Sequence, residues 1–376
     1  MRVRIGDICT TFSGFTPAAA DLFQAGKYPY FKVSEMNREA NLRVMTETDS
    51  YVRESRKFFP KGAIVFPKNG AAIATNKKRI LGQDSIVDLN TGGVKANEDI
   101  VDTNYLYYLF QNIDFSQFMR RGAVPTLDLK SILALEIELP TIPDQHLIVK
   151  ELDLLSGIVE KKNAQLKIMG DLEQSVFYEM LDQPDSSSFP VFKLSQLSRQ
   201  KLSYGSGASA VEFNGNVRYV RITDIQEDGT LTENSMSPDS YDEKYLLHEG
   251  DILFARSGAT VGKTFLYNKQ DGKSIYAGYL IRFVPDVSVV YPEYIYHFTR
   301  SQYYKAFVRA NAQAVAQPNI NAQQYGNLEI CVPPMSLQKD FVERIMSIDS
   351  QKATIRRSIK VAQNLLASRL DNYFNV

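Results

Sequence analysis

The chain has 376 residues, of which 44% are hydrophobic and 23% are charged, so it carries enough apolar material for two or three folded cores, which excludes a mainly disordered protein. Its 43 Lys and Arg residues equal its 43 Asp and Glu residues, which excludes attraction to nucleic acid or to an anionic membrane through net charge. Any such partner must therefore be met by local charge.

Cysteine and histidine usage indicates neither disulfides nor a metal site. Cys9 and Cys331 are too few for a disulfide framework or a zinc cage, so we expect both to be reduced thiols in folded cores. The three histidines are not spaced as metal ligands. The N-terminal segment lacks the apolar run of a signal peptide, and no stretch approaches the roughly 20 apolar residues that span a bilayer. We therefore expect a soluble, cytoplasmic protein without a membrane partner.

The predicted elements form the same arrangement twice along the chain: a mixed α/β domain followed by a long helix. From Val3 to about Pro140, short β-rich runs alternate with Gly, Asn and Asp turns, which is typical of a mixed α/β domain. The segment after Pro143 contains no proline until the polar linker QPDSSS, and it predicts a long helix. A second mixed domain and a second long helix follow. The predicted boundaries are 1–142 and 184–335 for the domains, and 143–183 and 336–376 for the helices.

The two halves of the chain are copies of one module. The matching segments lie 188 to 193 residues apart: FPKGAIVFPKNG (59–70) aligns with LHEGDILFARSG (247–258), YLYYLFQN (105–112) with YIYHFTRS (294–301), LEIELP (135–140) with LEICVP (328–333), Pro125 with Pro318, and Gln145 with Gln338. This period is far above the roughly 20 to 50 residues of solenoid repeats, so a whole module has been duplicated.

Each predicted helix has ten seam positions at alternating spacings of four and three, and eight of the ten are apolar or aromatic, as in a coiled coil. The seam residues that carry the prediction are Ile148, Leu152, Leu155, Val159, Leu166 and Met169 in the first helix and Ile345, Ile348, Ile355, Ile359 and Leu366 in the second. We expect an antiparallel pair with a globular domain at each end. The alternative, in which each helix packs on its own domain, stays open. Gly157 and Gly170 each cost the first helix about 1 kcal/mol relative to Ala.

No catalytic motif is found, and no catalytic residue is predicted. Ser257 to Thr264, SGATVGKT, resembles a phosphate-binding P-loop, but that mechanism needs a helix to begin at the Lys-Thr pair. The residues that follow, TFLYN, read as a strand. The serine-hydrolase elbow and the zinc-protease helix motif are also missing from the sequence. The sequence therefore favours a binding protein over an enzyme.

Local basic clusters are the candidate binding sites. Arg53 to Arg79 holds eight basic residues against one acidic residue, Glu54, and such a cluster can neutralise phosphates. The second module has fewer charges, followed by the Asn- and Gln-rich run Arg309 to Gln324, whose amides can pair with adenine edges. A solvated surface or a polar turn is the alternative for any one of them. The candidate DNA-binding residues are Lys57, Lys61, Lys68, Asn69, Lys77, Lys78, Arg79, Arg120, Arg121, Arg256, Ser257, Lys263, Arg300 and Arg309.

Taken in order, these segments resemble a known family, the specificity subunits of type I restriction-modification systems. The resemblance covers the whole chain and rests on the opening RIGDICTTFSGFTP, the segments YPYFKVSEMN and KGAIVFPKNG, the turns VPTLDLKSI and QPNINAQQY, the LEIELP and LEICVP strands, and both long helices. The second module departs from the pattern at its opening, which reads FKLSQLSRQKLSYGSG.

The resemblance implies an α+β protein with two target-recognition domains, each reading one half of a split DNA site. It implies that the helices set the distance between the half-sites and dock two modification subunits. The family members are not catalytic and bind no cofactor themselves. S-adenosylmethionine is expected on the modification subunits, and ATP and Mg²⁺ on restriction subunits. Two alternatives stay open: a scaffold that does not bind DNA, and a nucleotide-binding enzyme that uses Ser257 to Thr264.

Overall fold

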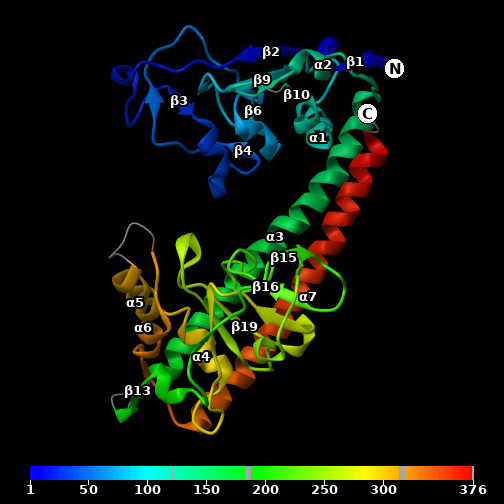
Figure 1. Ribbon diagram of the computed structural model, residues 1–376. Coiled ribbons are helices and arrows are strands. Elements are labelled where there is room, and N and C mark those ends of the chain that lie inside the picture. The colour runs from blue at the N-terminus through cyan, green and yellow to red at the C-terminus, as the bar shows by residue number, and fades with distance from the viewer. Residues whose placement is uncertain (121, 183–187, 313–317, 375–376) are drawn as a thin grey trace. The chain divides into compact units, whose positions relative to one another are not determined.

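The computed structural model describes residues 1–120, 122–182, 188–312 and 318–374, which form two compact units (Figure 1). Unit 1 is Met1–Asn163 with Arg357–Val376, and unit 2 is Ala164–Arg356. The two long helices, α3 (Ile142–Leu181) and α7 (Met335–Tyr373), each contribute to both units. The predicted linker lies outside the described residues apart from Ser188, as do the last two residues of the predicted second helix.

Both long helices begin one residue before the predicted boundaries, α3 at Ile142, so that Pro143 lies in its first turn, and α7 at Met335. At the start of α3, the amide of Asp144 donates to Thr141 Oγ1, and the Thr141 hydroxyl donates to the Asp144 carboxylate at 2.6 Å. These reciprocal bonds cap the first turn of the helix. The start of α7 follows Pro333 and Pro334 directly. Among the described residues, no helix is long and apolar enough to cross a membrane.

Unit 1 is built on a mixed five-stranded sheet. Its strand order is β2 (Cys9–Ser13), β9 (Thr91–Ala96), β6 (Ile64–Pro67), β7 (Arg79–Leu81) and β4 (Val44–Met45). A smaller sheet orders β5 (Tyr51–Val52), β3 (Tyr28–Phe31) and β8 (Ile86–Val87). Two antiparallel pairs join β1 (Arg2–Arg4) to β12 (Glu136–Glu138) and β10 (Met119–Arg120) to β11 (Thr126–Leu127). The short helices are α1 (Thr103–Asn112) and α2 (Leu129–Leu133).

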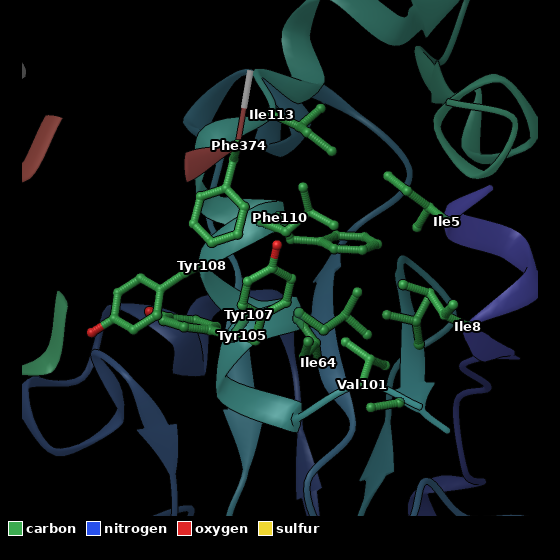
Figure 2. Packing of buried hydrophobic residues seen from close by; sticks show 14 of the residues in the cluster. Ile5, Ile8, Ile64, Val101, Tyr105, Tyr107, Tyr108, Phe110, Ile113 and Phe374 are labelled. Atoms are coloured by element: carbon green, nitrogen blue, oxygen red, sulfur yellow. The ribbon is translucent and has the colours of Figure 1, made fainter. Parts of the chain in front are cut away.

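The core of unit 1 combines the sheet, α1 and the ends of both long helices. Ile64 of β6 and Phe110 of α1 are fully buried, and Phe374, directly after α7, is 2% exposed in the same cluster (Figure 2). The rings of Phe374 and Tyr105 lie 5.0 Å apart in an edge-to-face arrangement. From α3, Leu152 enters this cluster. The core of the first domain is therefore completed by both helices.

Unit 2 has a four-stranded antiparallel sheet in the order β14 (Ser203–Tyr204), β21 (Leu280–Phe283), β18 (Ile252–Ala255) and β19 (Thr264–Leu266). Three strand pairs join β13 (Val191–Lys193) to β22 (Glu329–Cys331), β15 (Ala210–Glu212) to β17 (Met236–Pro238), and β16 (Arg218–Val220) to β20 (Ser274–Tyr276). Its short helices are α4 (Pro292–Phe298), α5 (Gln302–Ala312) and α6 (Ala322–Gly326). Phe177 of α3, Phe341 of α7 and Tyr294 of α4 pack in its core.

The duplication read from the sequence recurs in the strand register. Val3 of β1 pairs with Ile137, and Phe192 of β13 pairs with Ile330. The next backbone bond is also repeated, because the amide of Ile5 donates to Leu135 at 3.0 Å and that of Leu194 to Leu328 at 2.8 Å. The second module therefore begins with the same strand and turn as the first, although its amino-acid sequence differs there.

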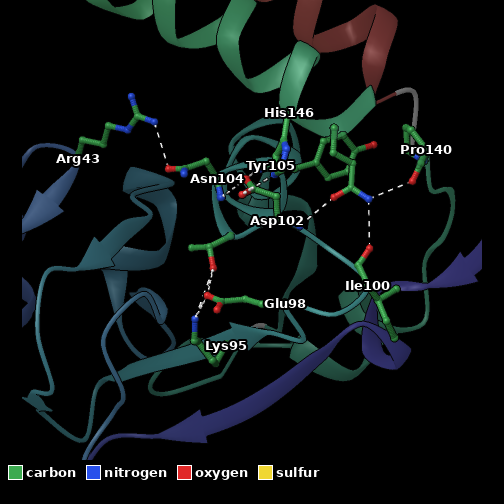
Figure 3. A network of polar contacts seen from close by, with 11 residues as sticks. Arg43, Lys95, Glu98, Ile100, Asp102, Asn104, Tyr105, Pro140 and His146 are labelled. Carbon is green, nitrogen blue, oxygen red and sulfur yellow. Dashed lines mark hydrogen bonds and ion pairs between the residues drawn. The ribbon is translucent and has the colours of Figure 1, made fainter. Parts of the chain in front are cut away.

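A buried glutamine fastens the start of each long helix to its domain. In α3, the side-chain carbonyl of Gln145 accepts a bond from the amide of Asp102, and its amide group donates to the carbonyl oxygens of Ile100 and Pro140 (Figure 3). In α7, Gln338 makes the same three bonds, to Tyr291, Val289 and Pro333. Both glutamines are fully buried. Because a buried amide must have partners, this geometry gives a physical reason for glutamine at both repeat positions.

The long helices pair antiparallel within each unit, as the seam pattern predicts. In unit 1, Arg369 and Tyr373 near the end of α7 contact Glu151 near the start of α3, at 2.9 and 2.6 Å. In unit 2, Arg344 near the start of α7 contacts Glu179 near the end of α3 at 2.8 Å. The buried seam residues are Leu152, Leu155, Ile345, Ile348, Ile355 and Ile359, while Ile148, Val159, Leu166, Met169 and Leu366 are partly buried. The helices also pack on the globular cores, and each helix does so in both units.

Two polar seam positions meet as a buried ion pair in unit 2. Lys352 Nζ lies 2.7 Å from Glu173 Oε1, and the two side chains are 14% and 7% exposed. Burial raises the pKa of Glu173 above its usual value, although Lys352 opposes the shift. A charge pair of this kind costs desolvation energy, but it specifies which residues face each other along an apolar seam.

Replacing Lys352 by Met should destabilise the chain by about 2–4 kcal/mol at neutral pH, because it leaves the Glu173 carboxylate buried without its partner. The double replacement Glu173→Met with Lys352→Met should recover most of that loss, since both partners become apolar. Urea unfolding of the three proteins measures the difference. Arg344→Met is the matched control: it breaks an exposed pair and should cost less than about 1 kcal/mol. Equal stability of Lys352→Met and the parent chain would contradict the role given to the pair.

Candidate nucleic-acid interface

The same loop is anchored in the same way in both units. In unit 1, the amide of Gly70 donates to the carbonyl of Pro125, and the amide of Leu127 donates to that of Lys68, both at 2.8 Å. In unit 2, Gly258 donates to Pro318 at 3.0 Å and Ile320 to Arg256 at 2.8 Å. We call Lys68–Gly70 anchored loop 1 and Arg256–Gly258 anchored loop 2. These four bonds join segments that the sequence repeat had matched one by one.

Each anchored loop ends in a glycine that its conformation requires. Gly70 has φ +79° and Gly258 has φ +68°, in the left-handed region that favours glycine. A Cβ atom on either residue would find no heavy atom within 4 Å, so the requirement is conformational and not steric crowding. A short 3₁₀ turn begins after Gly70, at Ala71–Thr75, and at Gly258 itself, over Gly258–Thr260. The backbone therefore has the same left-handed conformation at the end of both anchored loops.

Anchored loop 1 brings together three of the predicted residues of unit 1. The Lys68 ammonium donates to Ser13 Oγ, and the Asn69 side chain donates to the carbonyl of Leu89 at 3.3 Å. Asn69 also bridges to Thr126 of the β10–β11 hairpin. That hairpin carries Arg120, which is exposed and paired with Asp128 at 2.6 Å. The predicted residue Arg121 lies outside the described residues.

Anchored loop 2 carries an arginine that lies close to two aromatic rings. The guanidinium carbon of Arg256 lies 4.8 Å from the ring centroid of Tyr204 and 5.9 Å from that of Tyr279. The two rings are 41% and 60% exposed. Within the described structure, the buried Arg256 Nε has no hydrogen-bond partner. Ser257 is 8% exposed, and its backbone bridges to Asn319.

Sequence reasoning missed Tyr204 and Tyr279. Tyr204 occupies the place that Ser13 has in unit 1: Ser13 pairs with Gly92 beside Phe66, and Tyr204 pairs with Ile281 beside Phe254. The matching of Phe66 with Phe254 in the repeat could have identified this tyrosine. Tyr279 has no comparable signal, because it reaches Arg256 only through the fold.

One predicted DNA contact, Lys78, is wrong. Its side chain is fully buried, and its ammonium donates to the carbonyl of Ile113 at 2.7 Å and to Asn76 Oδ1 at 2.5 Å. The ammonium also lies 4.2 Å from the ring centroid of Phe115. Burial lowers the pKa of Lys78 to about 7, with Asp114 opposing the shift. A lysine occupied by internal partners cannot reach a phosphate, and a run of basic letters does not reveal which member points inward.

The remaining candidates of unit 1 lie apart from anchored loop 1 in the chain. Lys57 and Lys61 are exposed on the segment before β6. Lys77 donates to Asn37 Oδ1. Arg79 is partly buried, and its guanidinium donates to the carbonyl oxygens of Lys78 and Met36 at 2.8 and 3.1 Å. Lys57, Lys61 and Lys77 therefore remain predicted phosphate contacts, while Arg79 already serves the backbone.

The remaining candidates of unit 2 come together at one cavity. Lys263, Arg300 and Arg309 all line it. Lys263 pairs with Glu227 at 2.8 Å, Arg300 donates to the carbonyl of Asp228 at 2.9 Å, and Arg309 is exposed on α5.

The segment that resembles a P-loop does not have P-loop geometry. Gly258–Thr260 forms a 3₁₀ turn, and Thr264–Leu266 is strand β19, antiparallel to β18. Because the chain enters a strand where the nucleotide-binding motif needs the N-terminus of a helix, the amides that would hold phosphates are not presented. The nucleotide-binding alternative is not supported by this geometry.

Comparison with known proteins matches both modules. The family model described as "Type I restriction modification DNA specificity domain" matches residues 1–168 and 189–363. The MjaIX specificity subunit of a type I restriction enzyme from Methanocaldococcus jannaschii is 21% identical over 90% of this chain and 81% of its own length. The StySPI specificity subunit of a type I restriction enzyme from Salmonella potsdam is 21% identical over 83% of this chain and 72% of its own length.

Two solved structures share the fold at low sequence identity. The S subunit of a type I restriction-modification system from M. genitalium aligns with 100% of this chain and 96% of its own at a TM-score of 0.59 and 13% identity. A chain from a study of type I R-M complex assembly aligns with 100% and 97% at a TM-score of 0.53 and 16% identity. With the family model covering both modules and each module carrying the same anchored loop, the chain belongs to the family of type I restriction-modification DNA specificity domains.

Proposed function

We propose that this protein is the DNA-specificity subunit of a type I restriction-modification complex and that each globular domain reads one half of a bipartite site. The observation that carries the proposal is the anchored loop with a cation at its start, repeated in both modules of a member of this family. A duplicated reader with unlike side chains suits a split site whose halves differ.

In each domain, the cation of the anchored loop is proposed to contact phosphates, and neighbouring polar side chains are proposed to contact bases. Lys68 and Arg256 supply positive charge where a duplex backbone can approach, which fixes the register of the domain but carries no sequence information. Base edges in the major groove are then read by neighbouring polar side chains, such as Asn69 in unit 1. The two loops hold their cations differently, since the Arg256 guanidinium lies close to two aromatic rings and the Lys68 ammonium donates to a hydroxyl.

Methyl transfer and DNA cleavage belong, in this proposal, to partner subunits in the cytoplasm. This chain binds no cofactor and is not catalytic. Two modification subunits bring S-adenosylmethionine, and restriction subunits use ATP and Mg²⁺. The family membership and the P-loop-like segment that continues as a strand support this division.

Methylation sequencing tests the function directly. Cells that carry this chain with its modification subunits should methylate one bipartite motif, and Lys68→Ala or Arg256→Ala should lower methylation at that motif. In binding assays, each variant should flatten the slope of log affinity against log salt by about one, because one phosphate contact is lost. Lys339→Ala, an exposed lysine of α7, is the control and should leave both measurements unchanged. A pure scaffold would give no motif and no DNA shift even with its partners.

The long helices are proposed to set the number of unread base pairs between the half-sites. Both α3 and α7 contribute residues to both units, so their length limits how far apart two DNA-reading loops can be held. A heptad keeps the seam in phase and adds about 10 Å to a helix.

Inserting one heptad near the middle of each helix should therefore lengthen the gap in the methylated motif by about three base pairs, since duplex DNA rises roughly 3.4 Å per base pair. The half-site sequences themselves should stay the same. Methylation sequencing reports the gap. Replacement of seven residues at the same places without insertion is the control, and an unaltered gap after insertion would refute the spacer role.

The helices also carry the proposed docking face for modification subunits. Apolar side chains of α3 stay exposed one position before the seam: Leu147, Leu154 and Ile158 in unit 1, and Ile168 and Leu172 in unit 2. They recur at intervals of 7, 4, 10 and 4 residues, all in phase with the four-and-three spacing of one helix face, which Glu151, Lys161 and Gln165 interrupt. Leu147, Leu154 and Ile168 are 64–66% exposed, so the chain itself does not cover them.

The replacements Leu154→Gln and Ile168→Gln should weaken assembly with the modification subunits while leaving the melting temperature of this chain nearly unchanged, because neither side chain is buried. Sedimentation of the mixed subunits measures the stoichiometry, which should fall below two modification subunits per chain. Glu160→Gln, an exposed residue off this face, is the control. Full assembly by the double variant would exclude this face as the docking site.

A further inference from the structure

A cavity of about 770 Å³ opens in unit 2 between α3, α5, α7, the β18–β19 hairpin and the segment that holds Gln226, Glu227 and Asp228. Its lining includes Gly170 from α3, Lys305 and Arg309 from α5, and Arg356 from α7. Its size falls within the range of sites that hold small ligands or parts of larger ones.

The charge of this cavity is strongly one-sided. Seven cationic side chains line it against three carboxylates. Each carboxylate already contacts one of the cations: Glu173 meets Lys352 at 2.7 Å, Glu227 meets Lys263 at 2.8 Å, and Asp228 meets Arg356 at 3.0 Å. The pairs account for three cations, so the cavity keeps a surplus of positive charge.

Three of the other cations that line the cavity, Arg300, Lys305 and Arg309, carry the argument for a ligand. The Arg300 guanidinium donates to two neutral acceptors, the carbonyl of Asp228 and the Tyr296 hydroxyl. Lys305 and Arg309 stand one turn apart on α5, and both are exposed. Nearby, His297 is 3% exposed, and burial together with the charges of Arg300 and Lys352 lowers its pKa to about 3. The same positive field would attract an anion.

Gly170 gives a second reason to regard the cavity as a built site. In the middle of a helix, glycine is the poorest choice apart from proline, and the seam pattern offers no account of it. Here a Cβ atom would find no heavy atom within 4 Å, although the residue lines the cavity. Glycine at this position leaves the cavity empty, because any larger side chain would project into it.

We propose that this cavity is an anion site that takes phosphate groups of the DNA backbone next to anchored loop 2. The inference rests on the proposed function and adds a contact to it. The β18–β19 hairpin carries both features, since Arg256–Gly258 forms the loop and Val261–Thr264 begins the cavity wall three residues later. A DNA strand whose backbone contacts Arg256 can therefore continue to Lys305 and Arg309. Free polyphosphate is the other source of the same chemistry.

Filling the cavity is the sharpest test, because it removes no charge. Gly170→Leu projects a side chain into the cavity from a helix that it should stabilise, and Gly170→Ala gives the helix benefit without the filling. The double variant Lys305→Gln with Arg309→Gln removes two cations, and Lys269→Gln with Lys339→Gln removes two exposed cations of the same unit outside the cavity. All are made in the full chain and assayed with its modification subunits for DNA affinity, salt slope and methylated motif.

Gly170→Leu and the Lys305 and Arg309 double variant should each lower DNA affinity about tenfold and flatten the salt slope by about one to two, while the methylated motif stays the same. Both controls should match the parent. In a parallel titration, sodium tripolyphosphate should raise the melting temperature of the parent chain and not that of Gly170→Leu.

If DNA binding is unaffected and tripolyphosphate still stabilises the parent but not the filled chain, the anion site stands with free polyphosphate as its ligand. If neither ligand distinguishes the filled chain from the parent, the anion site is overturned. If the parent complex methylates no motif, the proposed function is contradicted. The tripolyphosphate titration would still test whether the cavity binds anions.

Discussion

Each globular core of this protein is completed by the end of a helix that begins in the other module. Phe374, directly after α7, is buried against Tyr105 in unit 1, and Phe177 near the end of α3 is buried against Tyr294 in unit 2. Burying one such aromatic side chain contributes about 2–3 kcal/mol. If the end of α7 left unit 1, or the end of α3 left unit 2, the core of that unit would be exposed to water. The length and the pairing of the helices are thereby tied to the stability of the domains.

This constraint explains why the polar exceptions on the helices matter. Apolar seams alone tolerate a shift by one heptad, because the pattern of large residues repeats. A shift would separate Lys352 from Glu173 in the seam, and it would also pull Gln145 or Gln338 away from the backbone groups that each satisfies. The apolar seam supplies the attraction, and these polar groups specify one register, as the proposed spacer role requires.

The features predicted from the sequence are those that depend on spacing along the chain. The long helices, their antiparallel seam and the repeated loops all follow from local periodicity or from comparing one half of the chain with the other. Lys78 was predicted wrongly because its burial depends on Ile113 and Phe115, which reach it only after folding. The cavity around Gly170 could not be predicted, since its walls come from five separate segments of the chain. In the sequence, Gly170 reads only as a defect of the helix.

The duplication also separates what both half-sites need from what differs between them. The backbone bonds of the two anchored loops are the same, as are the bonds of Gln145 and Gln338, so both modules keep the frame that holds the loop. The side chains on that frame have diverged, with Lys68 beside Ser13 in one unit and Arg256 beside Tyr204 in the other. A split site with unlike halves needs this combination. Identical side chains would read the same sequence twice, and unlike frames would present their loops differently to a regular duplex.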